Sequence, residues 1–477
     1  MSIGATWLLY ELAGQIGIAK ALGSDRQGKL ALWQVMARLI GQGSRLSAVR
    51  LAQVHAACDV LGIKDKFNED HLYDNLAWIA DNQKQIEKKL LETRLNGAQP
   101  ELFLYDVTSS YFEGQKNELA EYGYNRDKKK GKKQVVIGLL CDDQGYPVAI
   151  ELFKGNTNDF DTFDSQVKKA VEEFGCQRVT FVGDRGMIKS SQITELKNHD
   201  KGLHYITAIT KPQIEKLIKN NIIQLGLFDS EICEVVHDET RYLLRRNPIR
   251  AKEIEINRQD KRESIERLIH VKNQYLETHS RASVDKAISV VNDRINKLRV
   301  QDWIKVYSDG RILNIHVDDE SLADKSKLDG CYVIKSDLPA VINKQVVHDR
   351  YKQLAEVEHA FRDCKTVMLE MRPWYVQTEK STRGAAFVVM LAYLIARHLE
   401  KVWAGFDSSV EEGISQLSTL CTMEVTVKGK GTCNMIPTPR ENSNRLLKAA
   451  KVRIPEVLPH LGVNVLSRKK LRKSVTA

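Results

Sequence analysis

From residue 102 the pattern of apolar residues changes from one typical of helices to one typical of strands. The block from 102 to 208, in which strands predominate, constrains the fold most strongly. Aromatic and β-branched residues in LFLYDVTSSYF and the near-continuous apolar run QVVIGLLCD predict two strands. A third strand, YPVAIELFKG, follows after a polar turn, and the short apolar strand RVTFVGD and the strand LHYITAI follow with helices between them. The order β-β-β-α-β-α-β predicts an α/β fold, a mixed sheet with helices against it.

The 477 residues are too many for one simple core, so we expect several domains. Residues 1–97 read as helices with scattered basic residues, which suits DNA binding, although a plain helical bundle fits equally well. The mixed sheet occupies residues 98–211, and an inserted α+β subdomain follows at 212–338. A second part of the sheet domain, 339–402, precedes a C-terminal region, 403–477, that ends in the basic run SRKKLRKS.

The net charge limits the kinds of binding partner that we expect, and the cysteine pattern indicates the cellular compartment. A net charge of +10 favours a polyanionic partner, although it says nothing about fold. The eight cysteines are scattered singly without a C-x-x-C pair, which predicts reduced thiols in the cytoplasm. The longest apolar run, 384–396, is too short to span a bilayer, so we expect a buried helix there and no membrane partner.

The stretch YKQLAEVEHAFRDCK (351–365) contains no Pro or Gly and predicts one amphipathic helix. At about 100° per residue, one narrow stripe carries a phenol, an apolar residue, a carboxylate and an ammonium group: Tyr351, Leu354, Glu358 and Lys365. Because apolar residues lie beside this stripe, we expect Glu358 to point where buried residues point and to need a partner, a proton or a metal. An ion pair with Lys365 or Arg362 is the simplest alternative.

Two further carboxylates lie on strands where a charge is locally unfavourable. Asp106 is in the middle of an aromatic and β-branched strand, and Asp184 ends an apolar strand. Each has a simpler explanation, a side-chain hydrogen bond to a turn for Asp106 and a turn position for Asp184. However, ligands bind at the carboxyl ends of strands in α/β sheets, and local sequence rules tend to fail at functional sites. We therefore group both residues with Glu358 as candidate catalytic residues.

Three converging carboxylates without His or Cys suit hard cations that prefer oxygen, Mg²⁺ or Mn²⁺. Two such ions about 3.5–4 Å apart can activate an attacking oxygen and stabilise a leaving one in phosphoryl transfer. The sequence therefore predicts a metal site formed by Asp106, Asp184 and Glu358, with two ions.

Candidate phosphate contacts lie near these carboxylates in the sequence. A basic loop follows the strand of Asp106 and contains Arg126, Lys128, Lys129, Lys130, Lys132 and Lys133. Lys365 shares the stripe of Glu358, and Arg372 and Trp374 follow that helix closely, where they would supply phosphate and stacking contacts. The alternatives are a solvated charge run for the loop and simple packing of the helix end for Arg372 and Trp374.

These motifs resemble the DDE transposases of bacterial insertion sequences, in the group marked by a Tyr-x2-Arg-x3-Glu-x6-Lys helix. Tyr351, Glu358 and Lys365 match that spacing, while Leu354 occupies the usual Arg position. YDVTSSYFEG, GYNRDKKKGKKQVVIGLL, GNTNDFDTF and VGDRGM resemble the blocks around the first and second aspartates of the family. VEHAFRDCK and MRPWYV resemble its third block, so the similarity covers about residues 100 to 400.

The resemblance implies an RNase H-like catalytic domain interrupted by an insertion subdomain before the glutamate. It matches Asp106, Asp184 and Glu358 to the metal-binding triad, and Tyr351 and Lys365 to residues that contact DNA. With Leu354 at the Arg position, Arg362 is a candidate to supply the missing charge. Residues 1–97 would correspond, less clearly, to the domain that binds transposon ends.

The function implied is that of a transposase, which binds terminal inverted repeats and catalyses metal-dependent strand cleavage and strand transfer. Its partner would be double-stranded DNA, both transposon ends and target, bound by a dimer. One alternative is an RNase H-like nuclease or resolvase that cuts without joining. Another is a non-catalytic DNA-binding repressor derived from a transposase.

Overall fold

The computed structural model describes residues 1–114, 116–229, 231–365, 369, 371, 374–427 and 431–468. Two compact units divide the chain. The first contains Met1–Tyr205 and Arg350–Ala477, and the second contains Ile206–Asp349. All three candidate carboxylates belong to the first unit.

The first unit begins with helices, as predicted for residues 1–97: α1 (Gly4–Gln15), α2 (Ile18–Leu22), α3 (Arg26–Ile40), α4 (Arg45–Val54), α5 (Ala57–Leu61) and α6 (Glu69–Leu95). Side-chain caps fix several of the helix starts. Asp25 accepts a hydrogen bond from the Gly28 amide at 2.7 Å before α3, and Asn68 caps α6. The helices α3 and α6 pack against α15 (Glu379–Trp403), so the first and last thirds of the chain share one core.

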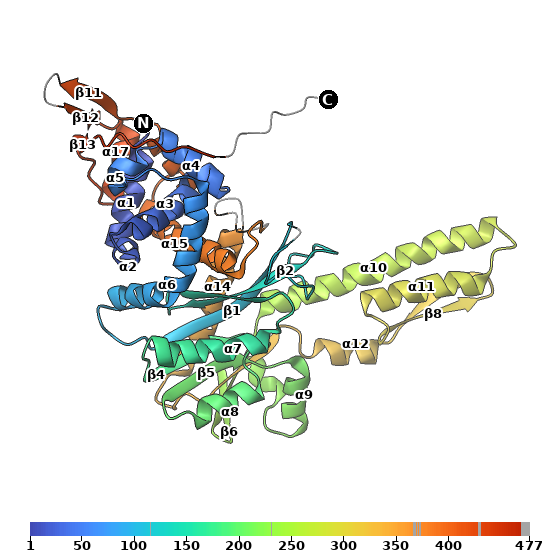
Figure 1. Cartoon of the computed structure of the whole chain (residues 1–477). Helices are drawn as coiled ribbons and strands as arrows, with labels where there is room; N and C mark the ends of the chain where they lie inside the picture. Colours follow the sequence, from blue (N-terminus) through green and yellow to red (C-terminus); the bar gives the residue numbers. More distant parts are fainter. Residues whose placement is uncertain are drawn as a thin grey trace. The chain divides into compact units, whose positions relative to one another are not determined.

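The strands β3 (Pro147–Lys154), β2 (Gln134–Cys141), β1 (Leu102–Tyr111), β4 (Arg178–Gly183) and β5 (Gly202–Ala208) lie side by side in this order. The first three form an antiparallel meander, and β4 pairs with β1 in parallel (Figure 1). The predicted mixed sheet flanked by helices is therefore confirmed.

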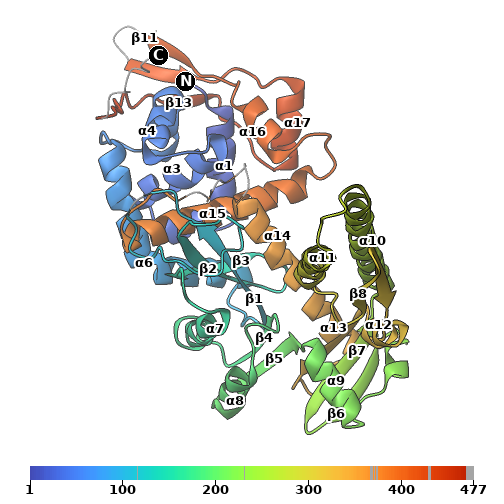
Figure 2. The same ribbon diagram turned by 90° about the vertical axis from the view of Figure 1, so that its right-hand side faces the viewer.

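Helices cover both faces of this sheet. On one face, α7 (Asp159–Lys168) and α8 (Ser190–Asn198) pack against an aromatic core that includes Phe103, Tyr105 and Phe163. On the other face lie α14 (Leu354–Lys365), which contacts β1 and β2, and α15, which contacts β3 (Figure 2). Because side chains alternate along a strand, Asp106 belongs to the face that α14 covers.

The single helix predicted for residues 351–365 is wrong. The chain forms α13 (Lys344–Lys352) and then α14, with a turn at Gln353, whose carbonyl accepts a hydrogen bond from the Glu356 amide at 2.9 Å. Tyr351 therefore lies in the last turn of α13, and the calculated stripe does not continue from it into α14. No Pro or Gly marks this break, so it had no local signal. By contrast, the predicted buried helix at 384–396 is confirmed within α15.

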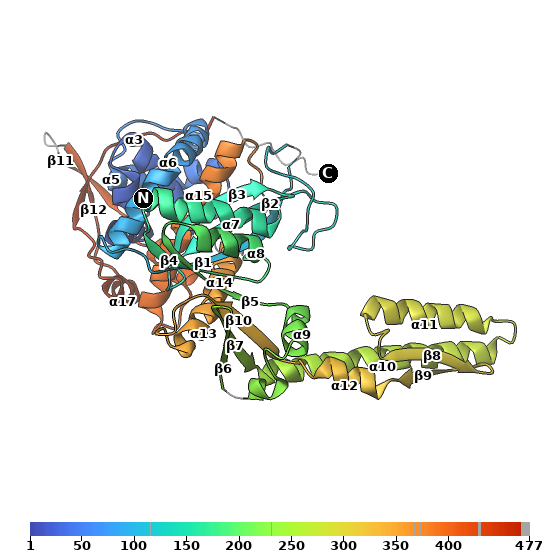
Figure 3. The ribbon, with the colours of Figure 1, turned by 90° about the horizontal axis from the view of Figure 1, so that it is seen from below.

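In the second unit, the end of β5 pairs with β10 (Cys331–Ser336), which pairs with β7 (Thr240–Arg246), and β7 pairs with β6 (Cys233–His237). The predicted helices at 250–277 and 283–298 are confirmed as α10 (Pro248–Thr278) and α11 (Val284–Leu298). They pack with the hairpin β8 (Ile304–Asp309) and β9 (Ile312–Val317) around a separate apolar core, as Figure 3 shows. This unit also contains α9 (Lys211–Lys219) and α12 (Asp319–Ser326).

The C-terminal region of the first unit contains α16 (Val410–Leu417), α17 (Glu441–Ala449) and a small antiparallel sheet of β11 (Met423–Val427), β12 (Gly431–Met435) and β13 (Val457–Pro459). The sequence interpretation missed this sheet. Of the helices in the described parts of the chain, none is long and apolar enough to cross a membrane.

Candidate active site

Asp106 and Asp184 lie at one position of the sheet. Asp106 is in the middle of β1, paired in register with Leu139 of β2 on one side. On the other side, β4 runs parallel with Tyr105 opposite Gly183, and Asp184 is the next residue. In this register Asp184, just after the carboxyl end of β4, lies opposite Asp106. Because neighbouring strands are about 4.8 Å apart, the backbones of the two residues are close.

Asp184 also begins a tight turn. Its Oδ1 accepts a hydrogen bond from the Arg185 amide at 2.7 Å, and its carbonyl accepts one from the Met187 amide at 3.0 Å. The side chain is exposed. The turn role that the sequence left open is therefore real, and it leaves the carboxylate accessible at the strand end.

Glu358 is exposed on α14, so the expectation that it points into the core is wrong. The buried residues of α14 are Val357, Ala360, Phe361 and Cys364. At 100° per residue they centre on a direction about 110° away from Glu358. The apolar residues beside the predicted stripe mark the core, whereas Glu358 lies at the border of α14 where the helix meets solvent.

The electrostatics of Asp106 connect the three carboxylates. Burial raises the pKa of Asp106 to about 7, the hydrogen bond from the Val107 amide opposes the rise, and the charges of Glu358 and Asp184 add to it. The nearby guanidinium of Arg126 lowers this pKa. Asp106 is only partly exposed, so these charges act through little intervening water. Glu358 and Asp184 therefore share the electrostatic environment of Asp106.

The chemistry of this group suits a hard divalent cation, because all three donors are carboxylates and their mutual repulsion falls when a cation lies between them. Within the described residues, no group of three or more His, Cys, Asp or Glu side chains is arranged closely enough to hold a metal ion. The donor types fit, but in this structure the three side chains do not yet converge on one point.

Lys365 fastens the end of α14 to the strand of Asp106. Its Nζ donates hydrogen bonds to Thr108 Oγ1 at 2.6 Å and to the Ser109 carbonyl, and it forms an ion pair with Asp127 at 3.2 Å. The exposed fractions of the Lys365 and Asp127 side chains are 9% and 4%. The ammonium group predicted to meet a phosphate is thus engaged inside the protein, two residues along β1 from Asp106. The sequence interpretation missed Asp127.

A second contact fastens the first turn of α14 to α15. Arg397 donates a hydrogen bond to Glu356 at 2.7 Å, and also to the Gln144 carbonyl at 2.9 Å and the Tyr393 hydroxyl at 3.2 Å. Although burial lowers it, the pKa of Arg397 is raised overall by its bonds to Glu356 and Tyr393. Glu358 is two residues from this contact, so the helix that carries it is held at both its first turn and its last.

The basic loop brings one of its cations, Arg126, near Asp106. Arg126 pairs with Asp159 and lies close enough to Asp106 to influence its pKa. Lys132 pairs with Glu113 at 2.8 Å, and the remaining lysines of the loop are exposed or half-buried: Lys128, Lys129, Lys130 and Lys133. Two exposed aromatic rings, Tyr122 and Tyr124, lie in the same segment. The combination of cations and exposed rings is typical of a nucleic-acid surface.

A pocket of about 350 Å³ lies between this loop and the turn after Asp184. Its lining comes from four segments of the chain and includes Tyr124, Arg126, Val136, Asp159, Phe160 and Lys189. The Lys189 ammonium is 4.0 Å from the centre of the Phe160 ring, a cation–π contact. The turn after Asp184 therefore borders a cavity whose lining carries two cations, Arg126 and Lys189, and the carboxylate of Asp159 that pairs with Arg126.

The segment after α14 has a different arrangement from the one predicted. Trp374 is buried, and its amide donates to the Tyr111 carbonyl at 3.4 Å beside the end of β1. The exposed ring of this segment is Tyr375, at 71% exposed. Arg362 is exposed on α14, while Arg372 lies outside the described residues.

The chain is similar to solved structures of two transposases, at low similarity. No curated protein matches the chain. The solved structures include a piggyBac transposase synaptic complex with hairpin DNA, with a TM-score of 0.34, 11% identity, and coverage of 72% of this chain and 57% of that one. They also include a Mos1 transposase paired-end complex with left transposon end, with a TM-score of 0.17, 11% identity, and coverage of 31% of this chain and 52% of that one. The chain thus spans just over half the length of each.

A family model described as a transposase DDE domain matches residues 97–395. The matched region contains Asp106, Asp184 and Glu358, and it makes up more than half of the 477 residues. The chain therefore belongs to the family of proteins with a transposase DDE domain.

Proposed function

We propose that this protein is the transposase of a bacterial insertion sequence, which binds the terminal inverted repeats and catalyses metal-dependent cleavage and joining of DNA strands. The observation that carries the proposal is the environment of Asp106. A carboxylate on a central strand, with its pKa raised to about 7 by burial and by two further carboxylates, is the kind of site that a divalent cation stabilises.

In this proposal, Asp106 and Asp184 are the fixed part of the site, since β1 and β4 hold them at adjacent positions of the sheet. Glu358 completes it from α14, which Lys365 and Glu356 fasten to its neighbours. Two Mg²⁺ or Mn²⁺ ions bound by these carboxylates would supply the positive charge that activates the attacking oxygen and stabilises the leaving oxygen.

Other residues position the DNA strand. The exposed lysines of the loop, Lys128, Lys129, Lys130 and Lys132, would contact backbone phosphates, and the half-buried Lys133 is a further candidate. Tyr122 and Tyr124 would support bases or sugars by stacking. Arg126, next to Asp106, would contact the phosphate nearest to the reaction. Arg362 and Tyr351 remain candidates for further contacts from α14 and α13.

The test uses a plasmid that carries the element with its own terminal repeats, the full-length protein and Mg²⁺. We expect excision and strand transfer with the wild type, and no detectable product with Asp184→Ala or Glu358→Ala. Asp407→Ala, which removes an exposed carboxylate between α15 and α16, serves as the matched control and should retain activity. Undiminished activity in either site variant would refute the assignment.

The same reactions separate the alternatives. Cleaved ends without joined product would identify a nuclease or resolvase, and binding of the repeats without cleavage would identify a repressor. Because the proposed chemistry acts on two transposon ends, we also propose a dimer on DNA, which the mass of the complex with end-bearing duplexes would show.

A further inference from the structure

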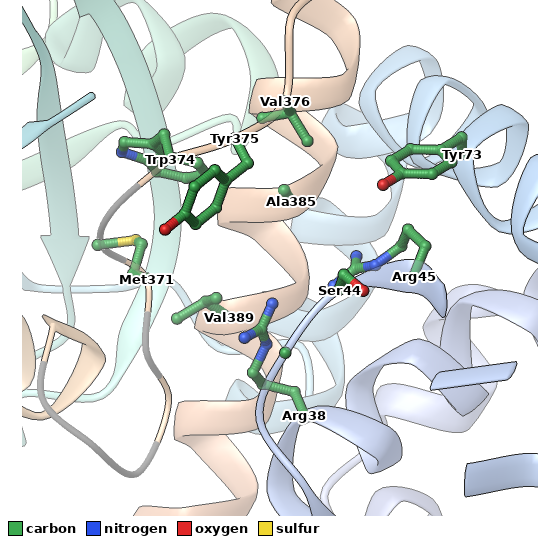
Figure 4. Close-up of a pocket in the computed structure, with 11 residues that line it drawn as sticks. Arg38, Ser44, Arg45, Tyr73, Met371, Trp374, Tyr375, Val376, Ala385 and Val389 are labelled. Carbon is green, nitrogen blue, oxygen red and sulfur yellow. The ribbon is translucent and has the colours of Figure 1, made fainter. Parts of the chain in front are cut away.

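A second cavity lies away from the carboxylates, within the first unit. It encloses about 220 Å³ and is lined by α3, the start of α4, α6, the segment before α15, and α15 itself. Figure 4 shows the guanidinium groups of Arg38 and Arg45 and the hydroxyl of Tyr73 pointing toward the same space. Val376, Ala385 and Val389 form an apolar wall opposite them. We call this cavity the arginine pocket.

Arg45 is placed at this pocket by a chain of buried amides. Its exposed fraction is 6%, and it donates a hydrogen bond to Gln34 Oε1 at 2.8 Å. Gln34 in turn donates to Asn75 Oδ1 at 2.7 Å, and Asn75 donates to Gln27 Oε1 at 2.7 Å. These partners are neutral, and in the described part of the chain Arg45 forms no ion pair with a carboxylate. The amides orient the guanidinium without neutralising it.

A buried cation without a counter-ion is unfavourable, and the other positive charges of the pocket increase this free-energy cost. Burial and the like charge of Arg38 lower the pKa of Arg45 to about 9, while Tyr73 opposes the shift. The amino-terminal end of α4, capped by Ser44, adds the positive end of a helix dipole to the pocket lining. Such an arrangement persists when a function requires it, because fold stability alone favours neutralising or removing the charge. An anion bound in the pocket would neutralise the charge of Arg45.

The position of the pocket indicates which anion. Its wall includes Trp374, whose backbone lies beside Tyr111 at the end of the strand that carries Asp106. Tyr375, also in the lining, presents an exposed ring that can stack on a base. Two guanidinium groups with a neighbouring aromatic ring are complementary to a phosphate with its nucleoside. DNA that occupies the proposed active site would also extend along this surface.

We propose that the arginine pocket binds one backbone phosphate of the DNA, with Arg38 and Arg45 as its charged contacts and Tyr73 as a hydrogen-bond donor. This inference rests on the proposed function and adds a contact between the N-terminal helices and DNA. It assigns a role to two arginines that no sequence motif marks, because an arginine within the pattern of a helix is indistinguishable from a surface residue until its surroundings are known.

The test measures binding of the full-length protein to a mixed-sequence duplex over a range of salt concentrations. Arg38→Gln removes one partly exposed charge from the pocket, and Ala385→Leu fills the pocket without changing any charge. Arg50→Gln, on α4 but outside the pocket lining, is the matched control for the loss of one positive charge. Thermal unfolding of each variant verifies that it is folded.

We expect both pocket variants to bind about 10-fold more weakly than the wild type, the effect of losing one charge-assisted hydrogen bond. Their plots of log affinity against log salt should be less steep by about 1, whereas Arg50→Gln should differ little from the wild type. The proposal is overturned if Arg38→Gln binds like Arg50→Gln, or if Ala385→Leu binds like the wild type. Cleavage by the wild type with unaltered binding by both pocket variants would refute this inference while leaving the proposed function intact.

Discussion

The strand β1 and the helix α14 each present one of the candidate carboxylates, but they do so in opposite ways. Asp106 is hydrogen-bonded into the sheet through its backbone, with neighbours on both sides, and burial raises its pKa. Glu358 is exposed on a helix that is fastened by side chains, through Glu356 in its first turn and Lys365 in its last.

The difference separates two tasks in one site. A strand in the middle of a sheet fixes a carboxylate in place, and burial there destabilises its charged form, which in the proposed site a cation would stabilise. A helix held by a few side-chain contacts keeps its carboxylate solvated. The comparison therefore predicts that removing the charge of Asp106 or of Glu358 will reduce activity equally but will change the stability of the folded protein unequally.

The largest expected effect is on activity. Asp106→Asn and Glu358→Gln should each reduce strand cleavage by about 1000-fold, because each removes a negative charge that holds the cations responsible for several kcal/mol of transition-state stabilisation. The two variants should differ in thermal stability when both are metal-free at pH 8. There Asp106→Asn should raise the thermal unfolding midpoint, whereas Glu358→Gln should leave it nearly unchanged. Equal midpoints for the two would contradict the comparison.

The next effect concerns the contact that fastens α14 to β1. Lys365→Met leaves the buried carboxylate of Asp127 without its ion-pair partner, so the free energy of unfolding should fall by about 3 kcal/mol. Adding Asp127→Asn should restore part of this loss, since the uncompensated charge disappears. Denaturant unfolding measures both, with the exposed Lys401→Met as the control. A double variant as unstable as the sum of the two single variants would show that the pair is not coupled.

A smaller effect depends on pH. The pKa of Asp106 is raised from 3.8 to about 7, so between these values the folded metal-free protein binds a proton more tightly than the unfolded chain. The contribution of this residue to stability is therefore present below about pH 4 and is lost as pH rises to about 7. Allowing for its partial exposure, we expect a loss of about 2 kcal/mol.

The measurement is the difference in unfolding free energy between the wild type and Asp106→Asn at pH 5 and pH 8, without divalent cations. The difference should shift in favour of the variant at the higher pH. A constant difference across this range would show that the carboxylate of Asp106 titrates normally.

The smallest effect tests the second contact of α14. Glu356→Gln removes the charge that pairs with Arg397, and because Glu356 is half-exposed the loss should be about 0.5–1 kcal/mol. Activity should fall only a few-fold, since Lys365 still holds the helix. Glu195→Gln, an exposed glutamate on α8, is the control in both assays. A loss of activity as large as that of Glu358→Gln would show that Glu356 itself acts in the site.

Much of the fold could be predicted from local patterns. The strand at 102–112, the buried strands after it, the helices α10 and α11 and the buried part of α15 follow from periodicity and from turn residues, which act over a few neighbours. The break between α13 and α14 at Gln353 could not be predicted. No helix-breaking residue marks it, so it depends on how the two helices pack in the folded chain. The small sheet β11-β12-β13 also escaped prediction, since its three short strands depend on each other.

The sequence by itself identified the three carboxylates as unusual residues, because a charged residue interrupts the apolar pattern of its strand or helix and is visible without a structure. It also determined the basic loop and the family resemblance. Only the tertiary structure decided what surrounds them. It placed Asp184 beside Asp106 through the pairing of β1 with β4, turned Glu358 to solvent, and engaged Lys365 with Asp127. It also brought Arg38 and Arg45 to one pocket. Burial and charge pairing depend on residues far apart in the chain, so they exist only once the chain has folded.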